Sequence, residues 1–286
     1  MSTRPVNAGF DSARHDARHD ARVRDRRVAA WYPLLLAVLA IVTLGPVLLL
    51  VLRVAAASWL YPNLLPSQGA ASSTLEAFST PGLWSAFTRS LLLAAATAVL
   101  ATVVGFVAGR GLVRAPSGIR SVATGAAFLP VIAPPIALGV GIQVLAIRAG
   151  VGGSDVGVLL AHVIPAAGYL TLYFLGVLSA YDRAMEDEAR TLGASAWQTL
   201  LRVTIPALRA RWLEALVLGA LVSWGQLALT LLVGGGAVQT LPVALLSFTR
   251  AGDDRLAAAA ALLLSIPPAL AFGVVQRGAR RTGASA

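Results

Sequence analysis

The sequence contains neither cysteine nor lysine in its 286 residues. Without cysteine it offers no disulfide, no thiol nucleophile and no cysteine-based metal site. Without lysine it has no P-loop, because the lysine of that motif reaches the nucleotide phosphates, and no lysine that forms a Schiff base. These two absences exclude an ordinary P-loop ATPase as the activity of this chain.

Charged residues are also scarce, at 13% of the chain, whereas hydrophobic residues make up 57% and the mean hydropathy is +0.75. A soluble domain carries about 25% charged residues, so the composition predicts an integral membrane protein. The net charge of +10 does not point to nucleic acid. The arginines cluster in short segments between apolar runs, which is how a membrane protein sets its orientation, and no nucleic-acid partner is expected.

Six apolar runs are long enough to cross a bilayer, which takes roughly 20 residues. Eighteen of the 23 arginines fall in the two tails and in the second and fourth gaps between runs. Because positive residues stay in the cytoplasm, we expect an all-α membrane protein of six transmembrane helices with both termini cytoplasmic. The first run is too long for the apolar part of a signal peptide, so we expect a retained helix. The runs cover residues 31–52, 88–109, 121–147, 156–179, 212–234 and 256–276.

The N-terminal tail contains the repeat "ARHDARHDAR", which places His15 and His19 four residues apart. That spacing could hold a metal ion. The alternative is a polar, disordered tail whose arginines meet anionic lipid, and the composition favours it. We therefore expect no metal site in this chain.

Two of the apolar runs are interrupted by residues that need partners. The third has three prolines within 130–135, which kink a helix and free backbone groups that protein or a wet cavity must satisfy. The fifth has Ser223, Gln226 and Thr230 at spacings of three and four, hence on one helix face. Gln143 adds another polar group. These four residues could line a solute pathway or bond neighbouring helices, and the sequence leaves both open.

No constellation of catalytic residues is present in the sequence. His162 is the sole histidine beyond the tail, and a lone histidine on an apolar helix is more often a hydrogen-bonded structural group than a ligand or base. Glu214 lies one turn inside the cytoplasmic edge of its run and reaches water by snorkelling. No two acids share an interior helix face, so paired acid–base catalysis is not expected.

The fourth gap has the signals of two short helices. Asp182 is placed to cap a first helix, and Gly193 suits the left-handed residue that follows its end. Ser195 and Gln198 form a capping box for a second helix. Pro206 interrupts the chain before the fifth run. The gap is therefore predicted to fold as helix, glycine turn, helix and proline.

Apolar residues form a stripe on each of these two helices. Such stripes either pack against the chain's own bundle or enter a groove on a partner, and physical reasoning alone leaves the two equal. The stripes consist of Met185, Ala189 and Leu192 on the first helix and Trp197, Leu200, Leu201, Thr204 and Ile205 on the second.

This gap resembles the EAA loop of permease subunits of bacterial binding-protein-dependent ABC importers. The family pattern is Glu-Ala-Ala, three residues, Gly, nine residues and Ile-x-Leu-Pro. Here Asp187-Glu188-Ala189 lies at the triplet, Gly193 follows after three residues, and nine more lead to Val203-Thr204-Ile205-Pro206. Asp187 and Glu188 depart mildly from the triplet, while the spacing is kept throughout. The resemblance covers roughly residues 55–276, including "LAHVIPAAGYL" and "TLPVALLSF".

The resemblance implies a type I ABC importer permease fold, in which the EAA loop fits a groove on a separate ATPase dimer. ATP and magnesium would be held by that ATPase, and no cofactor by this chain. Further implied partners are a second permease subunit, identical or homologous, a solute-binding protein outside the cell, and the lipid of a bacterial inner membrane. The implied coupling residues are Asp187, Glu188, Ala189, Gly193, Ser195, Trp197, Val203, Ile205 and Pro206.

The expected organisation follows from the runs and the resemblance together. Alternatives are a self-contained secondary carrier or a membrane-embedded enzyme, but a carrier should show intramembrane ionisable residues or an internal repeat, and neither is present. The substrate stays open among polyamines, sulfate, iron, thiamine and phosphonates. The expected segments are a disordered arginine-rich tail at 1–29, a transmembrane helix at 30–54, a periplasmic loop at 55–87, a five-helix core at 88–277 with its EAA loop at 180–211, and a cytoplasmic tail at 278–286.

Overall fold

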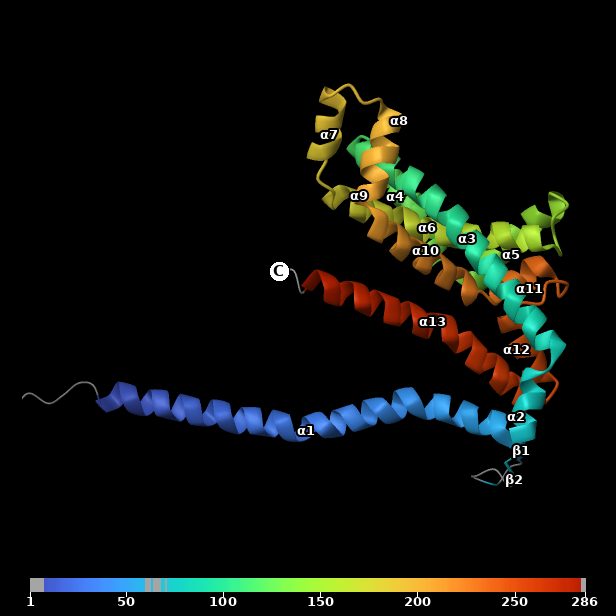
Figure 1. Ribbon diagram of the computed structural model, residues 1–286, viewed down its shortest axis with the longest axis horizontal. Helices are drawn as coiled ribbons and strands as arrows, with labels where there is room; N and C mark the ends of the chain where they lie inside the picture. Colours follow the sequence, from blue (N-terminus) through green and yellow to red (C-terminus); the bar gives the residue numbers. More distant parts are fainter. Residues whose placement is uncertain (1–7, 60–62, 64–67, 70, 284–286) are drawn as a thin grey trace, which may run out of the picture. The chain divides into compact units, whose positions relative to one another are not determined.

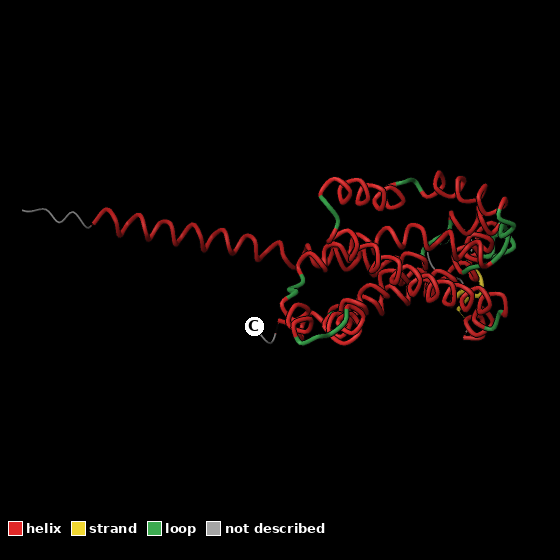
Figure 2. The backbone as a smooth tube through the Cα atoms, turned by 90° about the horizontal axis from the view of Figure 1, so that it is seen from above, coloured by secondary structure: helices red, strands yellow, loops and turns green. Residues whose placement is uncertain are grey.

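The structure is a computed structural model that describes residues 8–59, 63, 68–69 and 71–283 (Figure 1). It divides into two compact units, Met1–Leu52 and Arg53–Ala286, which are described separately. Figure 2 shows that the described chain is almost entirely helical.

The first unit is formed by helix α1, which runs from Ala8 to Ala55 and continues three residues into the second unit. Its stretch Trp31–Ala55 is apolar and long enough to cross a bilayer. The structure also places residues 8–29 in this helix, where the composition predicts disorder. Alanine and arginine, which dominate the repeat, have high helix propensity. The side chains of His15 and His19 lie outside the described part.

The segment predicted as a loop at 55–87 contains regular structure in its described part. Strands β1, Ala56–Ser58, and β2, Gln68–Gly69, form a short antiparallel pair. Helix α2, Ala71–Phe78, follows. Helix α3 begins at Pro81, seven residues before the predicted run, because proline is favoured in the first turn of a helix.

The centre of the second unit is made by long apolar helices in close contact. Helix α3 extends to Arg114, and helix α6 runs from Asp155 to Ala180. A Cβ atom added to Gly105 of α3 would lie 2.6 Å from the Cβ atom of Leu170 in α6. Glycine therefore allows the two backbones to approach. Helix α10 packs against both of them, as Figure 1 shows.

Two of the predicted runs are broken helices. The third run consists of α4, Ser117–Ile132, and α5, Pro135–Arg148, bent by 103°. The break falls at Ala133–Pro134. It is expected there, because proline has no backbone N–H and disfavours helical geometry in the residue before it. The fifth run consists of α10, Arg209–Trp224, and α11, Ala228–Gly234, bent by 63°.

The number of predicted spans is confirmed when each bent pair counts as one. Four described helices or stretches are long and apolar enough to cross a membrane, and the two bent pairs raise the number to six. The sixth run is helix α13, Asp254–Gly283. Helix α12, Leu241–Arg250, lies between the fifth and sixth runs and outside every predicted element, and it has a proline in its first turn.

Candidate functional site

The fourth gap folds as the sequence predicts, into two short helical segments. Helix α7 spans Ala184–Thr191 and helix α8 spans Ala196–Thr199. The N-cap residue of α7 is Arg183, whose side chain forms no capping hydrogen bond. The predicted capping residue, Asp182, lies one position earlier, and its Oδ1 accepts from the Ala184 backbone N–H at 2.9 Å. The second segment continues as a π-helical turn, η1, Leu200–Thr204, and a short helix, α9, Ile205–Ala207.

The turn between α7 and α8 is held by local backbone geometry. Gly193 has φ +88°, in the region where glycine is favoured, and its N–H donates to the Arg190 carbonyl at 2.9 Å. The capping box is confirmed in both directions. The Gln198 N–H donates to Ser195 Oγ at 3.2 Å, and the Ser195 N–H donates to Gln198 Oε1 at 2.8 Å.

Pro206 does not interrupt the helix as predicted, because a wider turn accommodates it. The Ile205 N–H donates to the Leu200 carbonyl, five residues earlier, which is the π-helical pattern. Proline has no N–H and clashes with the carbonyl four residues before it in an α-helix. In the π turn no N–H of residue 206 is needed, and the carbonyl four residues earlier is displaced from the proline ring. Helix α9 then ends at Ala207, and Leu208 lies outside regular helix geometry.

The apolar stripe of the loop divides between the bundle and the exposed surface. Leu192 is 82% exposed, Trp197 65% and Met185 60%. These three side chains therefore do not pack against the chain's own bundle. Of the nine predicted coupling residues, the structure exposes Asp187, Glu188, Gly193, Ser195, Trp197 and Pro206 and half-buries Ala189, Val203 and Ile205.

Glu186 is the residue that the sequence reasoning missed. Its side chain is 4% exposed and lies 3.4 Å from Arg110 Nη1 and 3.9 Å from Arg114 Nη2. The buried Thr204 hydroxyl donates to Glu186 Oε1 at 2.5 Å. Three consecutive acids, 186–188, stand in the sequence, but nothing local shows that the first of them turns inward.

The surroundings of Glu186 favour its ionised form. Burial by itself raises the pKa of this carboxyl, but the hydrogen bond from Thr204 and the charges of Arg110 and Arg114 outweigh it, so the pKa lies below its usual value. Glu186, Arg110, Arg114 and Thr204 are called the Glu186 cluster below. The cluster holds α7 against α3 and η1.

Beneath the loop, an aromatic group joins three of the long helices. Phe106 of α3 lies 5.4 Å from Phe174 of α6 and 4.7 Å from Trp212 of α10, measured between ring centroids. Leu200 and Leu208 from the loop pack on the same apolar cluster. Aromatic pairs of this kind stabilise a fold by about 0.5–1.5 kcal/mol beyond the effect of the area they bury. The loop therefore packs on a well-stabilised part of the helix bundle.

Ser223 and Thr230 form hydrogen bonds between helices within this chain. The helix break at Gly225 separates them, yet both reach the buried His162. His162 Nδ1 lies 2.8 Å from Ser223 Oγ, and Nε2 lies 3.0 Å from Thr230 Oγ1. The predicted single helix face is therefore interrupted, and His162 is buried with both ring nitrogens in hydrogen bonds. Gln226 lies in the break, where its carbonyl accepts from Thr230.

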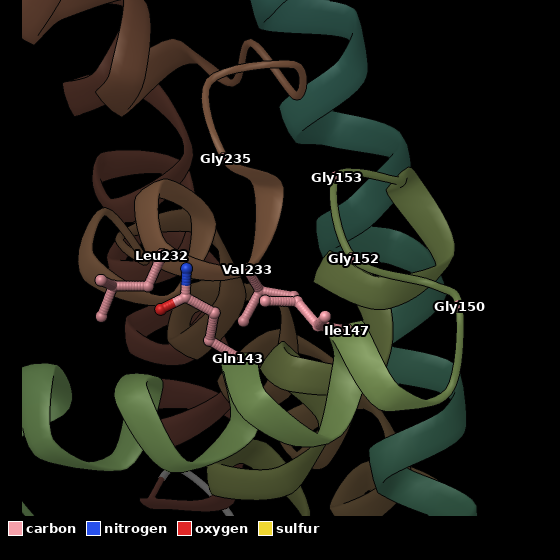
Figure 3. Close-up of a pocket in the computed structure, with 8 residues that line it drawn as sticks. All are labelled: Gln143, Ile147, Gly150, Gly152, Gly153, Leu232, Val233 and Gly235. Carbon is pink, nitrogen blue, oxygen red and sulfur yellow. The ribbon is translucent and has the colours of Figure 1, made fainter.

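Gln143 lies in a different place, at a cavity of about 250 Å³ between α5 and α11. Figure 3 shows its amide extending from α5 toward Leu232, with Val233 and Ile147 beside it. The glycines of the turn 150–153 complete the wall. The four predicted pathway residues thus fall into two groups, one around His162 and one at this cavity.

At the end of the second unit away from the loop, arginines are paired with acids. Arg89, in the third turn of α3, lies 2.8 Å from Asp155 at the start of α6. Arg255 lies 3.0 Å from Glu76. Arg53 pairs with Asp254. Within the residues that the structure describes, no three histidine, aspartate or glutamate side chains gather in a way that could hold a metal ion.

The chain is similar in sequence to permease proteins of several transport systems. It is 31% identical over 159 residues to PhnV of Salmonella typhimurium, which is named as the permease protein of a 2-aminoethylphosphonate transport system; the alignment covers 54% of this chain and 60% of that protein. It is 29% identical over 199 residues to the putrescine transport system permease protein PotI of Escherichia coli, covering 66% and 70%. It is 26% identical to the spermidine/putrescine permease protein PotC of Haemophilus influenzae, covering 61% and 68%. The chain thus spans about three fifths of the length of the Salmonella relative.

The fold is similar to that of a solved importer. A chain in the crystal structure of a bacterial ABC transporter involved in the import of the acidic polysaccharide alginate matches with a TM-score of 0.66 and 18% identity, over 89% of this chain and 97% of that one. At this identity the match shows the fold alone. Residues 101–281 match the family described as binding-protein-dependent transport system inner membrane component, and this chain belongs to that family.

Proposed function

We propose that this chain is the permease subunit of an ABC importer. It forms the solute route through the bilayer with a second permease subunit, identical or homologous, and takes work from a separate pair of ATPase subunits. Family membership and the six apolar spans support the proposal. ATP and magnesium belong to the ATPase, in keeping with the lack of any P-loop lysine in this chain.

The observation that carries the proposal is the exposed apolar surface of the α7–α8 loop. A hydrophobic residue such as Leu192, at 82% exposed, is usually buried in a soluble environment. The loop presents Met185, Leu192 and Trp197 on a segment that has a capping box at the start of α8 and packs on the aromatic group below. A firm segment with exposed apolar anchors suits insertion into a groove of a partner.

The arginine distribution assigns the sides of the membrane. The loop end carries Arg110, Arg114 and Arg120 together with those of the gap 180–211, and such residues stay in the cytoplasm. Both termini lie on that side with an even number of spans. The opposite end then faces a solute-binding protein outside the cell. An alginate transporter of similar fold has been solved in complex with an alginate pentasaccharide-bound periplasmic protein.

The substrate is expected to be a small charged solute. The relatives named above are assigned to 2-aminoethylphosphonate, putrescine and spermidine, and a further one of 29% identity is the sulfate permease 2 of the Chlamydomonas reinhardtii chloroplast. Few polar groups lie inside the spans, and we assign Gln143 and Gln226, both half-buried, to contacts with a solute in transit. Such a sparse lining suits passage better than tight binding.

A charge placed on the loop tests the proposal. Trp197→Glu puts a carboxylate on the exposed apolar surface and should abolish association with the ATPase subunits, together with ATP-dependent uptake. Leu75→Glu is the matched control, because Leu75 is 70% exposed on α2, away from the loop. The measurement is co-purification with that ATPase and uptake of labelled 2-aminoethylphosphonate, putrescine, spermidine and sulfate.

Insertion of the variant in the membrane at the wild-type amount is the required control for this test. Gly193→Pro should act in the same way as Trp197→Glu, since it removes the φ of +88° on which the turn depends. Normal uptake and normal ATPase association in both variants would contradict the proposed function.

A further inference from the structure

The Glu186 cluster connects three segments that are distant in sequence. Glu186 belongs to α7, Arg110 to α3 and Thr204 to η1. Among the described residues, the ion pairs and side-chain hydrogen bonds between α7 and α3 all involve Glu186. The pair is bidentate, because Arg110 Nη1 and Nη2 donate to Glu186 Oε1 and Oε2, each at 3.4 Å.

The pair lies where water screens it little. The Glu186 side chain is 4% exposed and that of Arg110 is 16% exposed. A buried pair often adds no net stability compared with apolar residues of the same size, whereas loss of one partner is strongly destabilising. Net stabilisation therefore does not explain why two charges are buried at this position. A connection that resists separation of α7 from α3 explains it.

The Glu186 cluster joins the loop to a helix that is not adjacent to it in the sequence. Along the chain, the loop is continuous with α6 on one side and α10 on the other. Helix α3 ends 70 residues before α7 begins, so no short segment transmits a movement of the loop to it. We infer that Glu186 is a positioning residue that makes α3 move together with the loop. This inference rests on the proposed function, in which the ATPase subunits move the loop.

Helix α3 is a central element of the bundle, because it packs against both α6 and α10. It packs along α6 with glycine contacts at Gly105 and Gly109, whose added Cβ atoms would lie 2.6 Å and 2.9 Å from side chains of α6. Without the cluster, a displacement of α7 would pass to α6 and α10 through the chain and reach α3 only through apolar packing, with no ion pair between the loop and α3. Hydrolysis would then continue while fewer cycles move solute.

Two variants cut the connection in different ways. Glu186→Gln keeps the shape of the side chain and an oxygen for the Thr204 hydroxyl but removes the charge that faces Arg110. The double variant Glu186→Ala with Arg110→Ala removes both charges, so no unpaired charge is left buried. Glu76→Gln is the matched control, since it removes a carboxylate from the 3.0 Å pair with Arg255 at the other end.

The experiment measures solute imported per ATP hydrolysed in vesicles containing the full complex with its ATPase and solute-binding protein. The solute is whichever of putrescine, spermidine, 2-aminoethylphosphonate and sulfate the wild-type complex imports. We expect both Glu186 variants to lower this ratio about tenfold, within the roughly 5–150-fold range of typical coupling, while hydrolysis stays within about twofold. Glu76→Gln should keep the wild-type ratio, because exposed pairs contribute little.

A covalent connection provides the rescue. The chain has no cysteine, so Arg110→Cys with Glu186→Cys introduces the sole pair of thiols in this subunit. Before crosslinking, this variant should show the low ratio; after reaction with a bifunctional maleimide, the ratio should return to within about twofold of the wild type. A purely structural role would not respond to a crosslink made after assembly.

The outcomes separate this inference from the proposed function. If the wild-type complex imports none of the solutes with ATP, the proposed function fails. If the wild type imports and the Glu186 variants keep its ratio, or the crosslink restores nothing, the inference alone is overturned. Absence of both Glu186→Gln and the double variant from the membrane would show that the cluster serves folding and would overturn it as well.

Discussion

At the residue scale, Gly193 and Glu186 hold the same loop but differ in how the sequence shows them. Gly193 needs only its own backbone, with φ at +88°, and its place between two helix signals predicts it. Glu186 depends on Arg110, which stands 76 positions earlier. Local sequence shows three acids in a row, and only the folded chain decides which of them is buried.

The conformation of Gly193 predicts the effect of adding a methyl group there. No atom lies within 4 Å of an added Cβ, so the cost of Gly193→Ala is backbone strain alone, about 1–2 kcal/mol for an L-residue in the left-handed region. The midpoint of thermal unfolding in detergent should fall. Gly176→Ala, in α6 with equally open space and no positive φ, should leave the midpoint unchanged or raise it. Equal midpoints for the two variants would contradict this account.

The lowered pKa of Glu186 predicts a dependence of stability on pH. Because the carboxyl titrates below its usual value in the folded chain, its contribution is complete above the unfolded pKa, about 4.3 for glutamate, and is lost as the pH falls toward the lower folded pKa. The difference in thermal midpoint between wild type and Glu186→Gln should therefore be largest near neutral pH and shrink between pH 5 and the acid limit. A constant difference over that range would speak against an ionised, buried Glu186.

At the scale of elements, the positions of the helix breaks cannot be read from the hydropathy pattern. The break before Pro135 could be predicted, because proline removes a backbone donor and restricts its neighbour. The break at Gly225–Leu227 contains no proline and was not predicted. It brings Ser223 and Thr230 onto the two ring nitrogens of His162, which lies on another helix.

The contact between α3 and α6 gives a matched pair of variants on one helix. In Gly105→Ala the new Cβ would lie 2.6 Å from the Leu170 side chain and 2.7 Å from its backbone carbon, so the helices must separate. We expect a loss of about 1–3 kcal/mol, the usual cost of overpacking. Gly111→Ala, with nothing within 4 Å, should be neutral or slightly stabilising. Chemical unfolding of both variants in detergent measures the difference, and an equal loss would refute the close contact.

At the scale of the whole molecule, orientation follows from charge rather than from packing. The arginines of the loop end outnumber the acids around them, whereas Arg89, Arg53 and Arg255 at the other end each pair with an acid. The pair Arg89–Asp155 joins α3 to α6, and the pair Arg255–Glu76 joins α13 to α2. The side of the membrane is nevertheless set during insertion, by arginines counted along the chain.

The absence of cysteine allows a direct test of orientation. We expect a membrane-impermeant maleimide to label Ser79→Cys, in the turn before α3, in intact cells. Gly118→Cys, at the start of α4, should be labelled only after the membrane is permeabilised. Both positions are exposed in the structure, so access is decided by the bilayer. The reverse pattern would place the α7–α8 loop outside and would contradict its assignment to an ATPase.

The sequence by itself determined the class of the protein, the number of spans and the capped form of the loop. Each of these depends on composition, on apolar runs or on hydrogen bonds between residues a few positions apart, such as Ser195 and Gln198. Only the tertiary structure decided that Glu186 faces Arg110, that His162 bonds Ser223 and Thr230, and that Gln143 lies at a separate cavity. Those contacts join residues far apart in the chain, so they exist only once the helices are packed together.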